Sequence, residues 1–526
     1  MSDDARKKME TDLSGHHRDG KKLHPPFQKL DGMTFSSWKD HRMPEMLWAV
    51  LAIGNWEREK ALEFFRYVGG YVERNPECWD VTLSGIAKLL PEKRAEFIVY
   101  IANWEGAPLL LKAMLIFPDF PARAEWEAVL GKLDDNDTAA ENIATSVMKV
   151  LWHQSQEATD CRWIKFLATI LAKRVKFSSS IKGIDETLRG VWEYPNYGDL
   201  THVRPFIRSG EIARVFDGEP DFTWANHFWE TCFLETGCIP ESGGKLPLFD
   251  AEAWDKEREH YLSETARARK SLITHCLKTA STSAVDYHHE GAFGLALYAQ
   301  LLMDEIVLHR LNFTAAGRLS LRAIAEAYIT LAYLLKKDDP STWRAFREHG
   351  TGQAKLVHLK LDELKKTPKF LDRKTIEAIA NEDAWQEFVS MNVGHWDDSN
   401  LRAMSEEAGL KEVYDQYYGW SSGYMHANWA AVRDTSYEKC FNPLHRLHRL
   451  PALGIKKLPD VLSDAVELTN EMLDLISVAY PTYPDRVAEY TESAVEAQKS
   501  SEPEVLPKDV AKQAENHADI SKKESE

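Results

Sequence analysis

The sequence predicts an all-α protein built from helical domains. Nearly every apolar run has helical spacing, with hydrophobic residues three and four positions apart, as in LLLKAMLIF (109–117), AAENIATSVMKVLW (139–152) and RWIKFLATILAKRVKF (162–177). Alternating Val, Ile and Thr strands joined by Asn-Gly turns are absent from the sequence. A chain of 526 residues is too long for one compact core, so two or three domains are expected.

One stretch divides the chain more clearly than any other. GCIPESGGKLPLF, residues 237–249, contains two prolines and three glycines and predicts a boundary near residue 245. It separates a helical domain at 26–245 from a second helical domain at 250–485. Another irregular stretch, 192–205, has helical patterns on both sides and therefore only interrupts the first domain.

Both ends of the chain are predicted to be disordered. Residues 1–25 are charged and polar, and residues 488–526 are rich in Glu, Lys, Ser and Ala, with no aromatic residue after Tyr490. Such segments bury too little apolar surface to offset the entropy lost on ordering. We expect no chemistry at either end.

The first domain contains a hint of repetition. The motif IGNWE at 53–57 returns as IANWE at 101–105, 48 residues later, and Trp152 lies 48 residues after the second tryptophan. HEAT-type and armadillo-type arrays have periods of about 40–47 residues, but 17 tryptophans also make one coincident spacing easy to find. A stacked helical array and an irregular bundle both remain open. In either case the domain is expected to dock or sense a protein partner.

Composition limits the classes of function. The formal net charge of −17 argues against a surface that binds nucleic acid everywhere, although it permits a local basic pocket. No apolar run approaches about 18 residues and the start has no hydrophobic signal core, so we expect a cytoplasmic protein without a membrane span. The six cysteines form no Cys-x-x-Cys pair, which predicts reduced thiols, no structural zinc and no cofactor.

In the second domain, RLSLRAIAEAYITLAYLLKK at 318–337 is apolar around nearly its whole circumference, which predicts a buried helix. Arg322 and Glu326 are four residues apart on it and can pair. A buried charge persists only when it is paired and hydrogen-bonded. The two residues are therefore either a structural ion pair or the lining of an internal pocket in which Arg322 could bind a phosphate or carboxylate.

A second polar stripe is predicted on the run LKEVYDQYYGWSSGYMHANWAAVRD at 410–434. If the run is one helix, seven residues fall within roughly a quarter of its circumference: Lys411, Asp415, Tyr418, Ser422, His426, Trp429 and Arg433. The mixture is more typical of a pocket lining than of a core stripe or a solvated face.

The pair Ser422 and His426 raises the question of a nucleophile and its base. A hydrolase presents its serine on a strained turn with a third residue orienting the histidine, whereas Ser422 and His426 lie four residues apart within one helical pattern. Ser422 is therefore predicted to be a neighbour in the site and not a nucleophile. His426 is either a structural histidine or an acid or base.

Two further polar clusters receive structural interpretations. DYHHEGAFG at 286–294 gathers Asp, His and Glu, but adjacent histidines on a helix cannot both face one ion, which favours a helix cap or surface patch. HRLHRLP at 445–451 is interpreted as a solvated turn.

The helix with Arg322-x-x-x-Glu326 and the Tyr-rich helix with Ser422-x-x-x-His426 resemble an uncharacterised, mostly bacterial domain family that is similar to HEPN helical domains. The resemblance covers about 293–432. It implies a HEPN-like bundle, dimerisation through it, and a role in antiviral defence or as a toxin. It also implies a pocket for RNA or a nucleotide, with Arg322, Glu326 and His426 as catalytic residues and Ser422, Tyr418 and Arg433 binding substrate.

Whether the protein is an enzyme stays open at the level of sequence. In an RNA-cleaving site of this kind, Arg322 would stabilise the developing phosphate charge and His426 would act as general acid or base from another helix. Pairs of Arg and His at the spacing of HEPN ribonucleases occur elsewhere in the chain only as often as chance predicts. The alternative is a non-catalytic helical scaffold whose Arg, Glu and His network is structural.

Overall fold

Helices dominate the structure, which confirms the predicted all-α fold. The computed structural model describes residues 17–19, 22–24, 36–175, 183–212, 221–242, 251–363, 368–382, 395–454 and 456–490. The predicted disordered ends, 1–25 and 488–526, lie mostly outside these ranges. Within the first of them, β1 (His17–Asp19) and β2 (Lys22–His24) form a short antiparallel pair.

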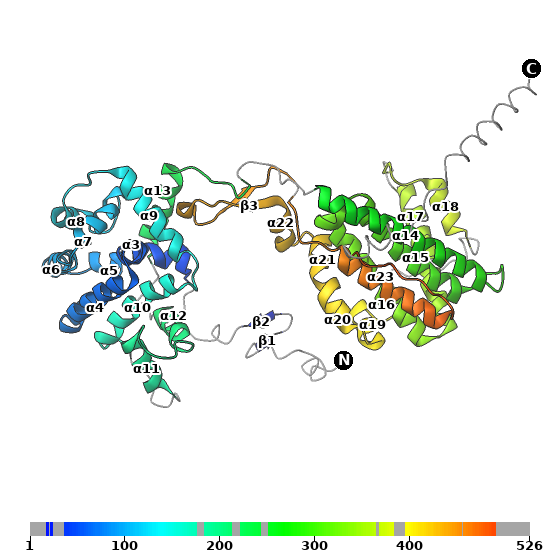
Figure 1. Ribbon diagram of the computed structural model, residues 1–526, viewed down its shortest axis with the longest axis horizontal. Coiled ribbons are helices and arrows are strands. Elements are labelled where there is room, and N and C mark those ends of the chain that lie inside the picture. Colours follow the sequence, from blue (N-terminus) through cyan, green and yellow to red (C-terminus); the bar gives the residue numbers. More distant parts are fainter. Residues whose placement is uncertain are drawn as a thin grey trace, which may run out of the picture. The chain divides into compact units, whose positions relative to one another are not determined.

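The chain folds into two compact units, which appear in Figure 1. Unit 1 contains residues 1–244 and 439–450, and unit 2 contains residues 245–438 and 451–526. The segment 439–450 therefore belongs to unit 1, whereas the sequence analysis assigned all of 250–485 to the second domain. Strands β3 (Tyr437–Lys439) and β4 (Arg449–Pro451) pair where the chain enters and leaves this segment.

Unit 1 is a set of mostly short helices around one hydrophobic core. Its helices are η2 (Trp38–Arg42), α2 (Met43–Glu45), α3 (Leu47–Asn55), α4 (Arg58–Arg74), η3 (Pro76–Cys78), α5 (Leu83–Ala87), α6 (Pro91–Ala102), α7 (Ala107–Leu111), η4 (Lys112–Ile116), α8 (Arg123–Leu130), α9 (Asn136–Val150), α10 (Gln156–Leu171), α11 (Ile184–Glu193), α12 (Val203–Ile212), α13 (Thr223–Glu235) and η8 (Pro443–His445).

Helix α3 shows that unit 1 is an irregular bundle and not a stacked array. All of Leu47–Gly54 is buried, and α3 packs against α4, α7, α9 and α10. In a stacked array each repeat contacts only its neighbours, whereas α10 begins more than two 48-residue periods after the end of α3. The predicted tryptophan repeat is also uneven: Trp56 and Trp104 both contact Phe64, while Trp152 is 67% exposed.

Unit 2 contains longer helices. They are α14 (Ala251–Thr279), α15 (Tyr287–Leu308), η5 (Leu311–Phe313), α16 (Ala315–Lys337), α17 (Pro340–Glu363), α18 (Arg373–Ala380), α19 (Leu401–Ala408), α20 (Lys411–Val413), η7 (Tyr414–Tyr418), α21 (Gly419–Met425), α22 (Trp429–Ser436) and α23 (Leu462–Ala479). As predicted, α16 is the buried central helix, and α15, α19, α21 and α23 all pack on it.

Helix α15 is the one described helix whose length and composition would allow a membrane span, contrary to our expectation that no run approaches that limit. It packs against α14, α16, α17 and α23 and contributes Phe293, Met303 and Ile306 to the core of unit 2. Core helices pass the same test of length and composition, and this packing accounts for the apolar sequence of α15.

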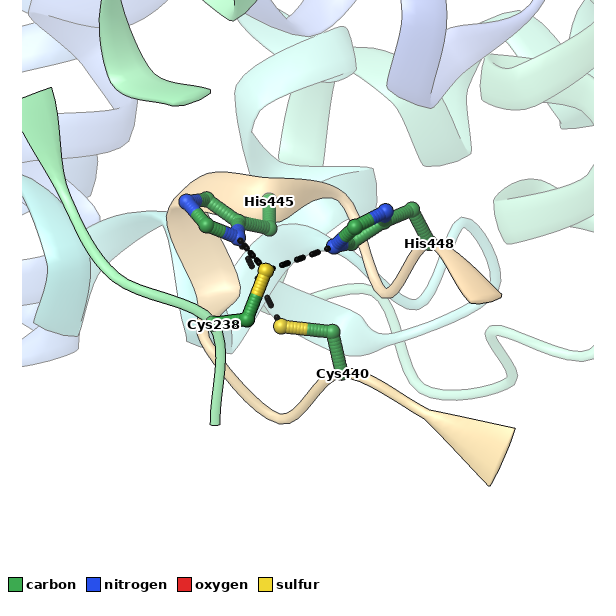
Figure 2. A group of neighbouring side chains, drawn as sticks. All are labelled: Cys238, Cys440, His445 and His448. Carbon is green, nitrogen blue, oxygen red and sulfur yellow. Dashed lines mark hydrogen bonds between the residues drawn. The ribbon is translucent and has the colours of Figure 1, made fainter. Parts of the chain in front are cut away.

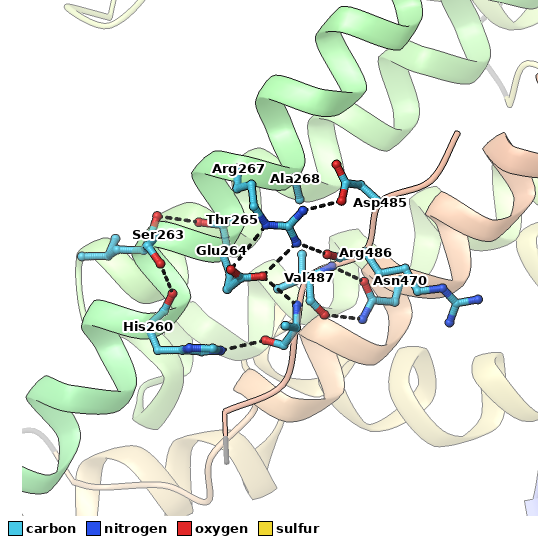
Figure 3. A network of polar contacts seen from close by, with 12 residues as sticks. His260, Ser263, Glu264, Thr265, Arg267, Ala268, Asn470, Asp485, Arg486 and Val487 are labelled. Carbon is cyan, nitrogen blue, oxygen red and sulfur yellow. Dashed lines mark hydrogen bonds and ion pairs between the residues drawn. The ribbon is translucent and has the colours of Figure 1, made fainter. Parts of the chain in front are cut away.

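The segment that follows α23 is held against α14 and α23 by polar contacts (Figure 3). The Arg267 side chain on α14 donates to Asp485 and to the carbonyl of Arg486. Asn470 on α23 exchanges two hydrogen bonds with the backbone of Val487, at 3.0 and 2.9 Å. These contacts give an extended segment without apolar periodicity the backbone partners that it would otherwise find in a helix or sheet.

Candidate functional site

The predicted site begins with Arg322 on α16. Its Nη2 donates to the Tyr418 hydroxyl at 2.8 Å, and its Cζ lies 4.4 Å from the centroid of the same ring. Its Nη1 lies 3.3 Å from a carboxylate oxygen of Glu326. The Arg322 side chain is 13% exposed and that of Glu326 is 40% exposed, so the pair lies at the edge of the core. Its contacts are therefore largely with the protein itself.

A second arginine makes a related contact one turn away. Arg318 donates to the carbonyls of Thr314 and Pro459, and its Cζ lies 5.5 Å from the centroid of the Tyr424 ring. Arg318 precedes Arg322 while Tyr424 follows Tyr418, so α16 and α21 run antiparallel. Two arginine–tyrosine contacts, each of the cation–π type, thus join α16 to η7 and to α21.

The run 410–434 is not the single helix that the stripe prediction assumed. It forms α20, the π-helical turn η7, α21 and α22, with a break at 426–428. Ala427 has φ 48°, and the side chain of Asn428 accepts from the backbone N–H groups of Ala430 and Ala431 to begin α22. The π turn shifts the angular register, and the break redirects the chain. The predicted stripe from Lys411 to Arg433 is therefore wrong as a continuous face.

The structure brings three of the six predicted site residues into contact and leaves the other three outside that group. Arg322, Glu326 and Tyr418 are in contact, as described above. Ser422 lies one turn after Tyr418 and is partly buried. His426 is exposed at the end of α21, and its ring has no hydrogen-bond partner within the described residues. Arg433 on α22 pairs with Asp434 at 2.6 Å, so neither His426 nor Arg433 joins the Arg322 group.

Asp434, the ion-pair partner of Arg433, lies near three cations. The hydrogen bond from Arg433 lowers the pKa of Asp434 below its usual range, burial opposes this, and Lys456 and Arg318 lower it further. Arg433, Lys456 and Arg318 outnumber this one carboxylate, so we call the surroundings of Asp434 a basic region, in which Arg318 is buried.

Exposed apolar side chains accompany this basic region. Met425 ends α21 and is 51% exposed, and Trp429 begins α22 and is 60% exposed. Trp429 and Arg433 are four residues apart on α22, so they share one face of it. The turn between α21 and α22 thus presents an aromatic ring, an imidazole and a guanidinium to solvent.

The polar cluster at 286–290 is a helix cap, as the sequence analysis favoured. Asp286 accepts from the backbone N–H of His289 at the start of α15. His288 contacts the Tyr480 hydroxyl at 2.6 Å, and His289 contacts the Thr279 hydroxyl at 3.0 Å. Each polar group has a partner of its own, and no common centre is formed.

Unit 1 contains a buried charged cluster that the sequence analysis missed. The Glu211 carboxylate is paired with Arg42 and Lys165 and lies 3.9 Å from Arg162. Burial alone would raise the pKa of Glu211, but Lys165, Arg42 and Arg162 together lower it. A pocket of about 870 Å³ borders this cluster and is lined by Trp38, Arg42, Arg162, Trp152, Phe441 and Leu447, among others. These residues are far apart in sequence, and no local pattern connects them.

The sequence analysis also missed a group of two cysteines and two histidines in unit 1, shown in Figure 2. The potential ligand atoms of Cys238, Cys440, His445 and His448 all lie within 4.8 Å of one another. Three of them form the local pattern Cys-x4-His-x2-His, which was available in the sequence. It was overlooked because only paired cysteines were sought and because 445–451 was interpreted as a solvated turn.

Comparison with known proteins gives one match. Residues 289–439 match the sequence model of a family described as a family of unknown function (DUF5677). This range contains all six predicted site residues, on the elements from α16 to α22, and it ends directly before Cys440. No curated protein and no solved structure matches the chain.

Proposed function

We propose that unit 2 is a HEPN-like domain that binds single-stranded RNA or a nucleotide at the turn between α21 and α22. The observation that carries the proposal is that Trp429 and His426 are exposed and Arg433 is partly exposed, beside the basic region around Asp434. An aromatic ring stacks on any base, and nearby cations attract the phosphate backbone.

The geometry favours binding over cleavage. Both outer nitrogens of Arg322 already have protein partners, in Tyr418 and Glu326. His426 follows Tyr418 by eight residues, which corresponds to about 12 Å along a helix with a rise of about 1.5 Å per residue. Cleavage requires a cation and an acid or base at one phosphate, so Arg322 would have to leave its partners first. In the proposal, Arg322 holds α21 on α16 and thereby positions the binding surface.

The test measures the affinity of the full chain for a fluorescein-labelled single-stranded oligouridylate. Fluorescence anisotropy gives the dissociation constant at each of a series of salt concentrations. Trp429→Ala is expected to weaken binding on the order of tenfold or more, because stacking contributes about 1–3 kcal/mol per base. Arg433→Ala is expected to weaken binding and reduce the salt slope by about one. Competition by ATP separates a nucleotide site from a site that requires a strand.

Trp192→Ala is the matched control, since Trp192 is an exposed tryptophan of unit 1. Binding by this variant should equal that of the wild type. A wild-type chain that binds neither probe, or a Trp429→Ala variant that binds as tightly as the wild type, would contradict the proposal.

A non-catalytic scaffold is the second candidate, and the internal contacts of Arg322 favour it. Under this alternative, Arg322→Ala lowers the melting temperature and no RNA or nucleotide binds. The expected role in antiviral defence or as a toxin is tested by comparing cell growth and RNA integrity on expression of wild type, Arg322→Ala and His426→Ala.

Two expectations about partners remain predictions. The resemblance to HEPN domains implies a homodimer through unit 2, which light scattering of the purified chain would detect. Unit 1, the helical bundle around α3, is expected to bind a protein partner.

A further inference from the structure

Two separate chain segments of unit 1 bring four metal-binding side chains together. Cys238 follows α13, while Cys440, His445 and His448 come from the segment 439–450 (Figure 2). The Cys238 Sγ lies 3.4 Å from Nδ1 of His445 and 3.4 Å from Nε2 of His448. The Cys440 Sγ lies 3.5 Å from Nδ1 of His445.

These distances match the edges of a tetrahedron around zinc. Bond lengths of about 2.3 Å to sulfur and about 2.0–2.1 Å to nitrogen, at tetrahedral angles, separate sulfur and nitrogen ligands by about 3.6 Å. The three sulfur–nitrogen distances are 3.4, 3.4 and 3.5 Å, within tenths of an ångström of this value, and every other pair of ligand atoms lies within 4.8 Å.

The surroundings of His445 fix which nitrogen faces the cysteines. Its Nε2 lies 3.2 Å from the carbonyl oxygen of Thr236 and 2.9 Å from the hydroxyl of the same residue. Donation of the Nε2 proton to the carbonyl leaves the lone pair on Nδ1, which points at both sulfurs. Metal-binding histidines almost always have such a partner for the second ring nitrogen.

The backbone holds the two cysteines in place from both sides. The N–H of Ile239 donates to the Cys440 Sγ at 3.4 Å, and the N–H of Phe441 donates to the carbonyl of Ile239 at 2.7 Å. The Asn442 side chain donates to the Thr236 hydroxyl and to the carbonyl of Gly237, at 2.9 and 2.8 Å. An N–H group aimed at a sulfur stabilises the charge that a thiolate carries.

The turn between the two histidines has an unfavourable backbone conformation. Arg446 and Leu447 are consecutive non-glycine residues in the left-handed region, with φ of 59° and 53°. Such conformations cost free energy and persist only where the surrounding structure determines them. The turn is what brings His448 back beside Cys440, whose N–H donates to the His448 carbonyl at 2.9 Å.

We propose that Cys238, Cys440, His445 and His448 bind one zinc ion that joins the segment 439–450 to the end of α13. Two thiolates and two imidazoles at tetrahedral spacing are the ligand set that zinc prefers. All four positions are supplied by the protein, so the site is structural and leaves no position for a reacting water. On binding, the two thiols release their protons, and two thiolates neutralise the charge of the ion.

The ion also fixes one wall of the pocket in unit 1. Phe441, Pro443 and Leu447 line that pocket, and all three lie on the loop between the ligands Cys440 and His448. The rest of the lining includes Trp38 and Arg162. Loss of the metal is therefore expected to loosen the pocket as well as the segment.

Two other states of these side chains make different predictions. A disulfide between Cys238 and Cys440 would remove both thiolates and abolish metal binding, and thiols that only hydrogen-bond to the imidazoles would bind no stoichiometric metal. A mass measurement of the alkylated chain distinguishes the disulfide from free thiols.

The first test is the metal content of the full chain, purified under reducing conditions after growth with added zinc. The wild type is expected to hold about one zinc per chain after gel filtration. Cys440→Ser and His448→Asn are expected to lose it. Cys276→Ser and His309→Asn, which change a cysteine and a histidine outside the cluster, should retain the full amount.

The second test replaces zinc by Co²⁺ in the wild-type chain and therefore does not depend on the folding of any variant. The expected spectrum has the d–d bands of tetrahedral cobalt and a thiolate charge-transfer band. A spectrum of six-coordinate cobalt, a wild type without metal under reducing conditions, or equal metal contents in wild type and His448→Asn would each overturn the proposal.

Discussion

Arg322 and Tyr418 are joined by two interactions at once. The guanidinium carbon lies 4.4 Å from the centroid of the phenol ring, and Nη2 donates to the ring's own hydroxyl at 2.8 Å. The contact joins α16 to η7, the π-helical turn that leads into α21. Loss of the Arg322–Tyr418 contact is therefore expected to lower the free energy of unfolding, whether or not unit 2 has an activity.

Tyr418→Phe is expected to lower the free energy of unfolding by about 1 kcal/mol, because it removes the hydrogen bond and keeps the ring. Tyr418→Ala should cost more, since it also removes the cation–π contact. Urea unfolding of the full chain measures both values. Tyr298→Phe is the control, because Tyr298 is an exposed tyrosine of α15. Equal effects of Tyr418→Phe and Tyr298→Phe would show that the hydrogen bond contributes nothing.

Gly423→Ala and Gly419→Ala are expected to differ although both add one methyl group to α21. A Cβ at Gly423 would lie 2.6 Å from the Asn428 amide nitrogen and would displace the side chain that caps α22, whereas a Cβ at Gly419 meets only a carbonyl at 3.8 Å. Alanine is the better helix former by about 1 kcal/mol, and a lost cap costs about the same. Thermal melting should therefore show Gly419→Ala to be the more stable variant, and the reverse order would contradict the cap.

Glu211→Gln is expected to destabilise unit 1 by about 3–5 kcal/mol, because it leaves Arg42, Arg162 and Lys165 without their common buried carboxylate. Chemical unfolding measures the loss. Glu193→Gln is the control, since Glu193 pairs with Arg189 at the surface, where an ion pair contributes about 0–1 kcal/mol.

Acid is expected to destabilise the wild type more than Glu211→Gln. Burial raises the pKa of Glu211, but Lys165, Arg42 and Arg162 lower it below the ordinary value of 4.5. A carboxyl group with a lowered pKa stabilises the fold above its unfolded pKa and loses that contribution as the pH falls toward the folded pKa. The melting temperature should fall more steeply in the wild type than in the variant below about pH 4.5. Parallel pH profiles would contradict this assignment.

Thr236→Val is expected to weaken metal binding in unit 1 by about tenfold, because the hydroxyl is one of two partners of His445 Nε2 and such partners tune metal affinity about 10- to 100-fold. Competition with a coloured zinc chelator measures the affinity. The matched control is Thr274→Val, whose hydroxyl bonds a carbonyl within α14. An affinity equal to that of the wild type would show that the hydroxyl does not orient the imidazole.

The sequence predicts well those features that depend on neighbours along the chain. The helical class follows from apolar spacing, the cap at Asp286 from residue type, and the pair Arg322–Glu326 from its four-residue separation. The break at 426–428 was not predicted because it depends on the Asn428 side chain packing against Gly423, a contact that sequence spacing does not reveal. The π turn before α21 also changes which residues share a helix face.

Features that join distant segments were beyond sequence reasoning. Ile239 and Cys440 are 201 residues apart, so nothing in the spacing of the cysteines connects Cys238 with the histidines of 445–448. The carboxylate of Glu211 meets Arg42 across 169 residues for the same reason. An irregular bundle could not be distinguished from a stacked array because apolar periodicity records that a face is buried and not which helix covers it.

The path of the chain has a consequence for any attempt to divide the protein. Because residues 439–450 return to unit 1, the polypeptide crosses between the units three times, after Gly244, after Glu438 and after Leu450. A truncation after residue 244 would retain Cys238 and discard its three partners, while a fragment limited to 289–439 would stop before the first of them. To express unit 1 alone with all of its residues, the N-terminal fragment must therefore be joined to 439–450 by a short linker that replaces unit 2.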